Sequence, residues 1–205
     1  MSEPSVVRLG TVASTQEAAR ELPIGSVVVA EHQTAGRGRL DRRWEAPPGT
    51  ALLASFVLIP HPLLSLAVGV AAAEACGPRA RLKWPNDVLI DGRKAGGILV
   101  EMSAAKAVVG VGINLGWAPP GAARVEQTRD ALLEVLTERL TAWASAPAVA
   151  IVERWRELSD TLGRQVRVEV SGRVIDGLAQ DIADDGSLIV DGERVSVGDV
   201  IHLRA

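Results

Sequence analysis

The feature that most constrains the fold is a change of pattern near residue 163. After this point, short β-branched runs alternate with turn signals at close intervals, which is typical of a small β-barrel of roughly 40 residues. Apolar residues alternate first at Val166, Val168 and Val170. The turn signals that follow are Asp185-Gly186, Asp191-Gly192 and Gly198-Asp199. We therefore predict two domains, at residues 1–163 and 164–205.

Longer strand and helix patterns fill the first 163 residues. Strands are predicted at 5–9, 26–30, 51–59 and 107–115, and a hairpin joins 88–90 to 94–101 through Asp91-Gly92. Helices are predicted at 14–20 and 63–76, the second apolar on all sides and hence buried. Two more helices present the apolar faces 132–143 and 151–162. Ser14 is expected to cap the first helix, with Glu17 as its capping-box partner.

Charge and cysteine content exclude several classes of protein. The net charge is −3, and residues 164–205 alone hold five basic and eight acidic residues, opposite in sign to a nucleic-acid-binding barrel. The one cysteine, Cys76, excludes an internal disulfide and is expected to be a small buried residue. No leader pattern and no apolar run of about 18 residues is present, so we expect a soluble cytoplasmic protein, away from DNA and membranes.

The irregular segment 34–50 contains the first candidate site, Gly36–Trp44. Four arginines (Arg37, Arg39, Arg42 and Arg43) fall within seven positions of this loop. Guanidinium groups match phosphates or a carboxylate bidentately, and the glycines let backbone approach a ligand closely. The alternative is a solvated basic loop or one that contacts nucleic acid. The spacing matches neither a P-loop nor a dinucleotide fingerprint.

The second segment runs from Lys83-Trp84-Pro85-Asn86-Asp87 to Lys94–Glu101. Only three of the 22 basic residues are lysines, and Lys83 and Lys94 both lie here. Gly96 and Gly97 weaken a strand unless a ligand needs their space, and Lys94 would then stand beside that ligand. A compact ammonium there could stabilise charge between a carboxylate and an α-phosphate. The alternative is a surface lysine beside an ordinary hairpin, and Asp87 would either cap a turn or help to hold Mg²⁺.

The third segment is Gly110-Val111-Gly112-Ile113-Asn114. Its alternating glycines leave one strand face bare for a flat ligand, and Asn114 could recognise that ligand by donating and accepting hydrogen bonds. The three histidines are scattered and show no metal-ligand spacing with Cys76, which makes a zinc site improbable.

Together these segments resemble the biotin–protein ligase family. The resemblance rests on Ser14-Thr15-Gln16, Gln33–Arg39 with Arg42 and Trp44, Lys83–Asp87, Lys94–Glu101 and Gly110–Asn114, in matching order, and covers essentially the whole chain. It implies an α/β catalytic domain with a mixed sheet, followed by a small SH3-like barrel. It also implies a two-step reaction: ATP and biotin give biotinyl-AMP, and biotin then passes to a lysine of a biotin carboxyl carrier domain of a carboxylase.

The resemblance also implies roles for particular residues. Lys94 and Arg39 are the expected catalytic residues, with Lys94 between the biotin carboxylate and the α-phosphate. The biotin pocket is expected to involve Ser14, Thr15, Gln33, Gly36, Arg37, Lys94, Gly97, Leu99, Gly110 and Gly112. The ATP and adenylate contacts are expected from Arg37, Arg39, Arg42, Trp44, Asn86, Asp87 and Asn114, with Mg²⁺ near Asp87.

The sequence departs from the family pattern at Asp41, where glycine is usual, and its charge slightly offsets the arginines. The chain begins almost at the first strand, so we expect a ligase without the N-terminal repressor domain of some members, as a monomer or homodimer. A lipoate or octanoate ligase of the same fold remains an alternative, as does a non-enzymatic module that binds nucleotide or nucleic acid.

Overall fold

Seven strands form a mixed sheet in the computed structural model, which describes residues 5–40, 42–170 and 172–203. In spatial order the strands are β1 (Ser5–Val12), β2 (Ser26–Gln33), β3 (Ala51–Leu58), β7 (Ala107–Asn114), β6 (Arg93–Met102), β5 (Asp87–Ile90) and β4 (Ala80–Lys83). β1 and β2 run parallel, and every other neighbouring pair is antiparallel. The predicted strands and the predicted mixed sheet are confirmed.

Local sequence explains the hairpin that links β5 to β6. Asp91 and Gly92 both have positive φ angles, 51° and 72°, as a two-residue turn of this kind requires. The chain therefore reverses at the position predicted from the Asp-Gly pair. This reversal brings Asp87 and Gly97 into register across the two strands.

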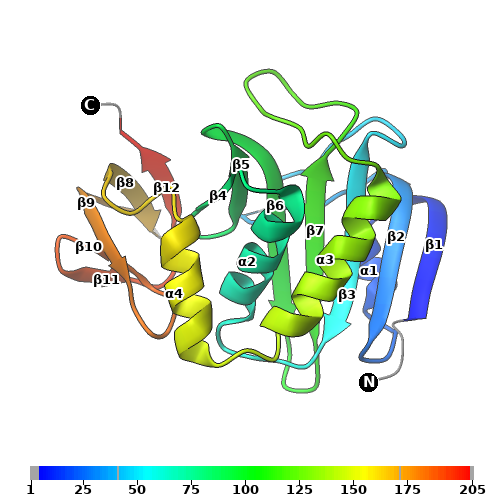
Figure 1. Cartoon of the computed structure of the whole chain (residues 1–205), viewed down its shortest axis with the longest axis horizontal. Helices are drawn as coiled ribbons and strands as arrows, with labels where there is room; N and C mark the ends of the chain where they lie inside the picture. Colours follow the sequence, from blue (N-terminus) through cyan, green and yellow to red (C-terminus); the bar gives the residue numbers. More distant parts are fainter. Residues whose placement is uncertain (1–4, 41, 171, 204–205) are drawn as a thin grey trace.

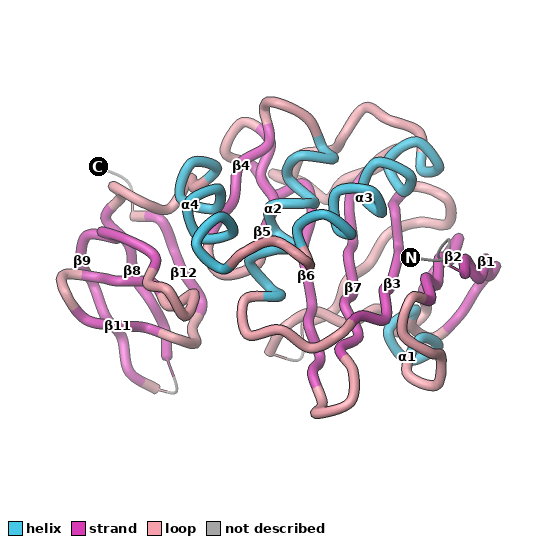
Figure 2. Tube along the Cα trace, turned by 60° about the horizontal axis from the view of Figure 1, so that its bottom comes forward, coloured by secondary structure: helices cyan, strands magenta, loops and turns pink. Residues whose placement is uncertain are grey.

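Helices cover the two faces of the sheet unequally (Figures 1 and 2). The large helices are α2 (Leu64–Cys76), α3 (Arg129–Trp143) and α4 (Ala148–Leu158), and the short helix α1 (Thr15–Ala19) lies on the opposite face from α2 and α3. Eleven of the thirteen residues of α2 are buried, as its all-round apolar pattern predicted. Cys76 at its end is buried too, and desolvation raises the pKa of its thiol to about 12.

Alternation along the central strands separates the two faces. Leu52, Ala54 and Phe56 of β3 enter the main apolar core beneath the large helices, whereas Val57 belongs to a small second cluster under α1. Residues of β3 and β7 that face away from the main core include Ser55, Gly110 and Gly112, which are small or polar. One face is thus filled with apolar side chains, and the other is open beyond the small apolar cluster under α1.

The C-terminal segment forms a five-stranded antiparallel sheet in the order β11-β10-β9-β8-β12. Its strands are β8 (Gln165–Val170), β9 (Arg173–Ile182), β10 (Leu188–Val190), β11 (Glu193–Val195) and β12 (Asp199–His202). Val166 and Val168 are fully buried, and the positive φ angles of Asp191 and Gly192 form the turn between β10 and β11. The predicted small β-domain is therefore present.

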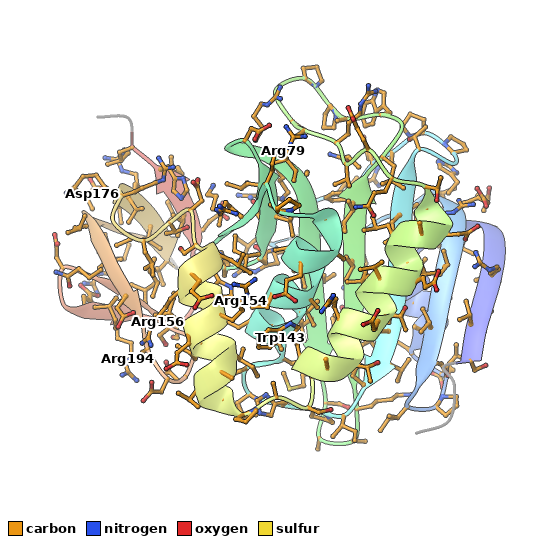
Figure 3. All side chains as sticks on the ribbon, viewed as in Figure 1. Arg79, Trp143, Arg154, Arg156, Asp176 and Arg194 are labelled. Carbon is orange, nitrogen blue, oxygen red and sulfur yellow. The ribbon has the colours of Figure 1, made fainter. Side chains whose placement is uncertain are left out.

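The C-terminal sheet is firmly attached to the rest of the molecule. Val166, Ile182 and Leu188 belong to the same apolar cluster as the large helices. The indole of Trp84 donates a hydrogen bond to the Gly186 carbonyl at 3.1 Å. Arg156 extends from the side of α4 that faces the barrel (Figure 3) and pairs with Asp181 at 2.7 Å.

The structure differs from the sequence-based expectations at the start of α1 and at the end of α4. Ser14 occupies the N-cap position of α1, but its side chain makes no capping hydrogen bond within the described residues, so the predicted capping box is wrong. The last long helix ends at Leu158, and Leu162 packs against the core from beyond it. Asp41 lies outside the described residues.

No helix among the described residues has the length and apolar character needed to cross a membrane.

Candidate active site

A cleft opens on the sheet face that the large helices leave uncovered. Its lining comes from the start of α1, the end of β2, the strands β3, β6 and β7, the start of β5 with the residue before it, several residues between 37 and 44, and one residue of the C-terminal domain. The lining residues are Ser14, Thr15, Gln16, Gln33, Arg37, Gly38, Arg39, Arg42, Arg43, Trp44, Leu53, Ala54, Ser55, Asn86, Asp87, Lys94, Gly97, Ile98, Leu99, Gly110, Val111, Gly112 and Asp199. Residues far apart in the sequence therefore meet in one place.

Buried polar side chains form one end of the cleft. Gln33 Oε1 accepts hydrogen bonds from the Thr15 backbone N–H at 2.7 Å and from Thr15 Oγ1 at 3.0 Å. Ser55 Oγ lies 2.9 Å from Thr15 Oγ1 and 3.1 Å from Gln16 Oε1. With its oxygen held in this way, the Gln33 amide has a fixed orientation, and its NH₂ group must point elsewhere.

Two buried polar atoms in the cleft lack a partner among the described residues, Ser14 Oγ and Trp44 Nε1. A buried hydroxyl or indole N–H without a partner costs about 1–3 kcal/mol. Such atoms are uncommon and point to a group that is bound during function. Ser14 is free for this purpose because it does not cap α1.

Glycines make room for side chains that lie on the sheet. A Cβ atom added at Gly112 would lie 2.6 Å from Cε2 of the Trp44 indole, and one at Gly97 would lie 3.3 Å from Cζ3 of the same ring. The indole therefore rests on the bare face of β6 and β7. A Cβ at Gly110 would lie 2.7 Å from Gln16 Oε1, so the space at Gly110 is taken by a protein side chain.

Lys94 and Asp87 stand together at the other end of the cleft. Lys94 Nζ lies 2.6 Å from Asp87 Oδ1, and 44% of the lysine side chain is exposed. The Cβ position of Gly97 is 3.5 Å from Lys94 Nζ, so the ammonium also lies over the glycine strand. The side chain of neighbouring Asn86 donates to the Ile98 carbonyl at 2.8 Å. This bond ties the turn that precedes β5 to strand β6.

The described residues of segment 36–44, which are all but Asp41, are called the arginine loop below and fold over the cleft as a narrow hairpin. Arg37 and Arg43 form an antiparallel bridge, and the Trp44 N–H donates to the Gly36 carbonyl at 3.0 Å. Three of its four arginine side chains contact protein acceptors. Arg37 pairs with Glu101 at 2.9 Å, Arg39 donates to Asn86 Oδ1 at 3.3 Å and to the Gly198 carbonyl at 3.2 Å, and Arg42 pairs with Asp199.

Burial and charge move the arginine pKa values in opposite directions. Desolvation lowers the pKa of Arg39, although Asp199 and Asp87 oppose this effect. The hydrogen bond that Arg42 donates to Asp199 raises the pKa of Arg42. Both guanidinium groups stay charged, because the ordinary value is far above neutral pH. Within the loop, Arg37 and Arg42 are thus paired with carboxylates, whereas Arg39 donates to two neutral oxygens.

Two protein-family models match this chain and show which family it belongs to. The family model described as the biotin/lipoate A/B protein ligase family matches residues 6–117, more than half of the chain. The model described as the biotin protein ligase C-terminal domain matches residues 161–203. The chain belongs to the biotin/lipoate A/B protein ligase family.

Relatives within this family have similar sequences and folds. The biotin–[acetyl-CoA-carboxylase] ligase of Mycobacterium tuberculosis is 40% identical over 88% of this chain and 80% of its own length. The enzyme of that name from Paracoccus denitrificans is 32% identical over 80% and 83%, respectively. The solved structure of Aquifex aeolicus biotin protein ligase with biotin and ATP has a TM-score of 0.82, with 27% identity over 98% of this chain and 99% of that one.

Most of the residues that the family resemblance implied line the cleft, but two do not. Asn114 is buried, and its amide donates to the Ala123 carbonyl at 3.0 Å, so it holds the segment after β7. Gly36 is buried at the base of the loop, and a Cβ atom there would collide with the Trp44 carbonyl. These two residues are placed beside the site, outside the described cleft lining.

Ser55 and Asp199 line the cleft but were not among the site residues predicted from the sequence. Ser55 is fully buried and is the only hydroxyl in the otherwise apolar strand β3, and that isolation was an available signal. Asp199 belongs to the C-terminal sheet, and only tertiary structure brings it to the cleft. No local pattern could have identified it.

Proposed function

We propose that this protein activates biotin with ATP and then attaches it to a lysine of a carrier protein. The observation that carries the proposal is one cleft with two chemically distinct ends. Buried hydrogen-bonding groups lie at one end and a group of cations at the other, with a glycine-rich floor between them. This arrangement suits a flat polar ring linked by an apolar chain to a carboxylate.

Biotin would lie with its ureido ring toward α1. Ser14 Oγ, which lacks a partner among the described residues, and the Gln33 NH₂ would hydrogen-bond the ring, and Thr15 would keep Gln33 in position. Leu99 and the glycine face of β6 and β7 would border the apolar chain. Gly36 and the Arg37 backbone would close the pocket beside the carboxylate.

The first step joins the biotin carboxylate to the α-phosphate. A carboxylate oxygen attacks the α-phosphorus, the bond from the α-phosphorus to the bridging oxygen breaks, and pyrophosphate leaves with the electron pair. Lys94 would stand between the two reacting groups, while Arg39 and Arg42 would neutralise the phosphates. No protein nucleophile is needed, because positioning and charge stabilisation supply the catalysis.

Trp44, Asn86 and Asp87 would complete the ATP contacts, with Trp44 covering the adenosine and Asn114 supporting the adjoining segment. The described protein residues alone do not form a complete magnesium site, but they fit a Mg²⁺ ion that the bound triphosphate also coordinates. Among the described residues no three His, Cys, Asp or Glu side chains are grouped to hold a metal. Asp87 would supply one oxygen and the triphosphate the others, as is usual for Mg²⁺, which would neutralise phosphate charge.

The second step transfers biotin to its acceptor. The neutral amine of a lysine attacks the acyl carbon of biotinyl-AMP, an amide forms, AMP leaves and the amine gives up a proton. The names of the curated relatives support a carboxylase carrier as the partner, in the form of a biotin carboxyl carrier domain. Cover by the arginine loop would keep water from the mixed anhydride until that lysine arrives.

Exchange of labelled pyrophosphate into ATP tests the first step, with biotin, lipoate and octanoate compared in parallel. We expect exchange with biotin alone. Exchange with lipoate or octanoate instead would retain the mechanism and replace the substrate. Absence of exchange with every acid, in protein shown to be folded, would reject the proposal. Mass spectrometry of a carrier domain incubated with biotin and ATP then tests the transfer.

A further inference from the structure

Glu101 ends the row of residues that β6 presents to the cleft. The row consists of Gly97, Leu99 and Glu101, and Gly97 and Leu99 line the cleft itself. Glu101 lies further along the strand, opposite Val108 of β7, and 28% of its side chain is exposed. A carboxylate in this position is the negative end of an otherwise apolar strand face.

Two arginines share this carboxylate. Arg20 Nη2 lies 3.1 Å from each carboxylate oxygen of Glu101, and Arg37 Nη2 lies 2.9 Å from Oε1. Arg20 is the C-cap residue of α1, the helix that carries Thr15 and Gln16, whereas Arg37 lies in the arginine loop. One side chain of the sheet therefore connects to two separate walls of the cleft.

The contact with Arg37 controls more of the loop than one residue. Arg37 is bridged to Arg43 across the hairpin, and the Trp44 N–H is bonded to the Gly36 carbonyl. A restraint on Arg37 is thereby passed to both stems of the loop. The tip is held independently, through Arg39 to Gly198 and through Arg42 to Asp199.

We propose that Glu101 is a positioning residue that fixes the base of the arginine loop over the cleft through Arg37. Its importance for catalysis rests on the proposed function of the cleft. Glu101 lies outside the cleft lining and has no contact with the reacting atoms, so it acts through Arg37. Loss of its charge would leave the loop attached at its tip and loose at its base. Water would then reach the adenylate more often.

Limited trypsin digestion of the ligand-free protein tests the positional part of this idea. Glu101→Gln keeps the shape of the side chain and every trypsin site, and we expect cleavage within residues 36–44 to be about fivefold faster than in the parent protein. Arg20→Gln is the matched control, because it removes the other partner of Glu101 and leaves the Arg37 pair. We expect its loop cleavage rate to stay within about twofold of the parent.

Three outcomes would overturn the proposal. The first is a Glu101→Gln loop that is cleaved no faster than the parent loop. The second is equal acceleration in Arg20→Gln and Glu101→Gln, which would mean that Glu101 only ties α1 to the sheet. Glu101→Asp, which keeps the charge on a shorter stem, should restore much of the protection. Lack of that rescue would equally count against a role for the charge.

The catalytic part is measured as the AMP released in excess of biotin transfer, divided by the biotin transferred to the carrier, because each transfer itself releases one AMP. In Glu101→Gln we expect this ratio to rise by about fivefold and the KM for ATP to rise more than kcat falls. An unchanged ratio beside faster loop cleavage would reject the catalytic role. If the parent protein shows no exchange with any acid, the proposed function fails, whereas the digestion still tests the position of the loop.

Discussion

The two faces of the seven-stranded sheet are built from the same strands and have different compositions. In β3, Leu52, Ala54 and Phe56 are sealed beneath the large helices, and intervening Ser55 belongs to the hydrogen-bonded end of the cleft. In β7, Val109, Val111 and Ile113 alternate with Gly110 and Gly112 in the same way.

This difference shows how stability and binding are separated within one element. A strand places successive side chains on opposite faces, so neighbouring positions are free to serve unrelated purposes. Substitutions on the helix-covered face should reduce the free energy of unfolding, and substitutions on the open face should reduce activity in a folded protein. The following predictions test this separation, in order of decreasing effect.

Phe56→Ala should produce the largest effect, on stability. The ring is 2% exposed within the main core, and removal of such a side chain costs about 3–5 kcal/mol of unfolding free energy. Denaturant unfolding measures the loss. Ile59→Ala, at a position 71% exposed just beyond the same strand, should change stability by no more than about 0.5 kcal/mol. Similar losses in both variants would contradict the assignment of the core face.

Lys94→Ala should reduce pyrophosphate exchange by about 10²–10³-fold, because an aligned cation beside the reacting charges is lost. Its partly exposed side chain makes little contribution to the core, so the unfolding free energy should change by less than about 1 kcal/mol. Exchange kinetics and denaturant unfolding of one preparation measure both quantities. Normal turnover, or an unfolded variant, would remove Lys94 from its proposed role.

Gly112→Ala should weaken binding of the adenylate by about tenfold, because the added methyl group cannot coexist with the Trp44 indole in its present position. Isothermal titration with a non-hydrolysable adenylate analogue measures this change. Gly10→Ala is the matched control in β1, where an added Cβ meets no atom within 4 Å. Unchanged affinity in Gly112→Ala would show that the indole position is unimportant for binding.

The smallest effect concerns the pH dependence of stability at the domain junction. Burial, followed by the nearby charge of Lys83, lowers the pKa of His202 below its usual 6.5, while Asp160 opposes the shift. The unfolded chain therefore takes up a proton at higher pH than the folded protein. Stability should fall as pH drops below 6.5 and level off once pH is below the folded-state pKa.

His202→Gln should flatten this part of the stability profile. The amide can replace the contact with Thr161, which lies 3.2 Å from the imidazole nitrogen. The pKa of Glu31 is lowered from its ordinary 4.5, mainly by a hydrogen bond that Arg129 donates. Glu31 therefore changes the stability only at pH values near and below 4.5. Urea midpoints at a series of pH values distinguish the two groups. An identical profile in the variant would exclude His202 as the source.

Local chemistry explains the features that the sequence predicted well. Asp91-Gly92 specifies a tight turn, and an apolar pattern on every side specifies the buried helix α2. Both features depend on local sequence and not on distant contacts. The three candidate segments were recognised because of their combination and order along the chain, since the glycine pattern at 110–114 is weak evidence by itself. The sheet order brings these segments together in the cleft. From the sequence, this proximity could be inferred only through the family resemblance.

The features that were missed depend on tertiary contacts. Ser14 has the position and chemistry of a cap, yet its hydroxyl is buried in the cleft without a capping bond among the described residues. Asn114 looks like a ligand contact, but the segment that returns to Ala123 uses its amide. Asp199 reaches Arg42 across 157 positions of sequence, a separation at which local patterns carry no information.

Pairing of the cleft cations has a consequence for selectivity. Lys94, Arg37 and Arg42 each begin with a carboxylate partner, so an incoming anion has to exchange places with it. A small anion such as inorganic phosphate would lose about as much in breaking one pair as it gains in forming another. A triphosphate joined to a nucleoside forms many contacts at once and can displace several carboxylates together. The three ion pairs should therefore favour an anion with several phosphate groups over a single small anion.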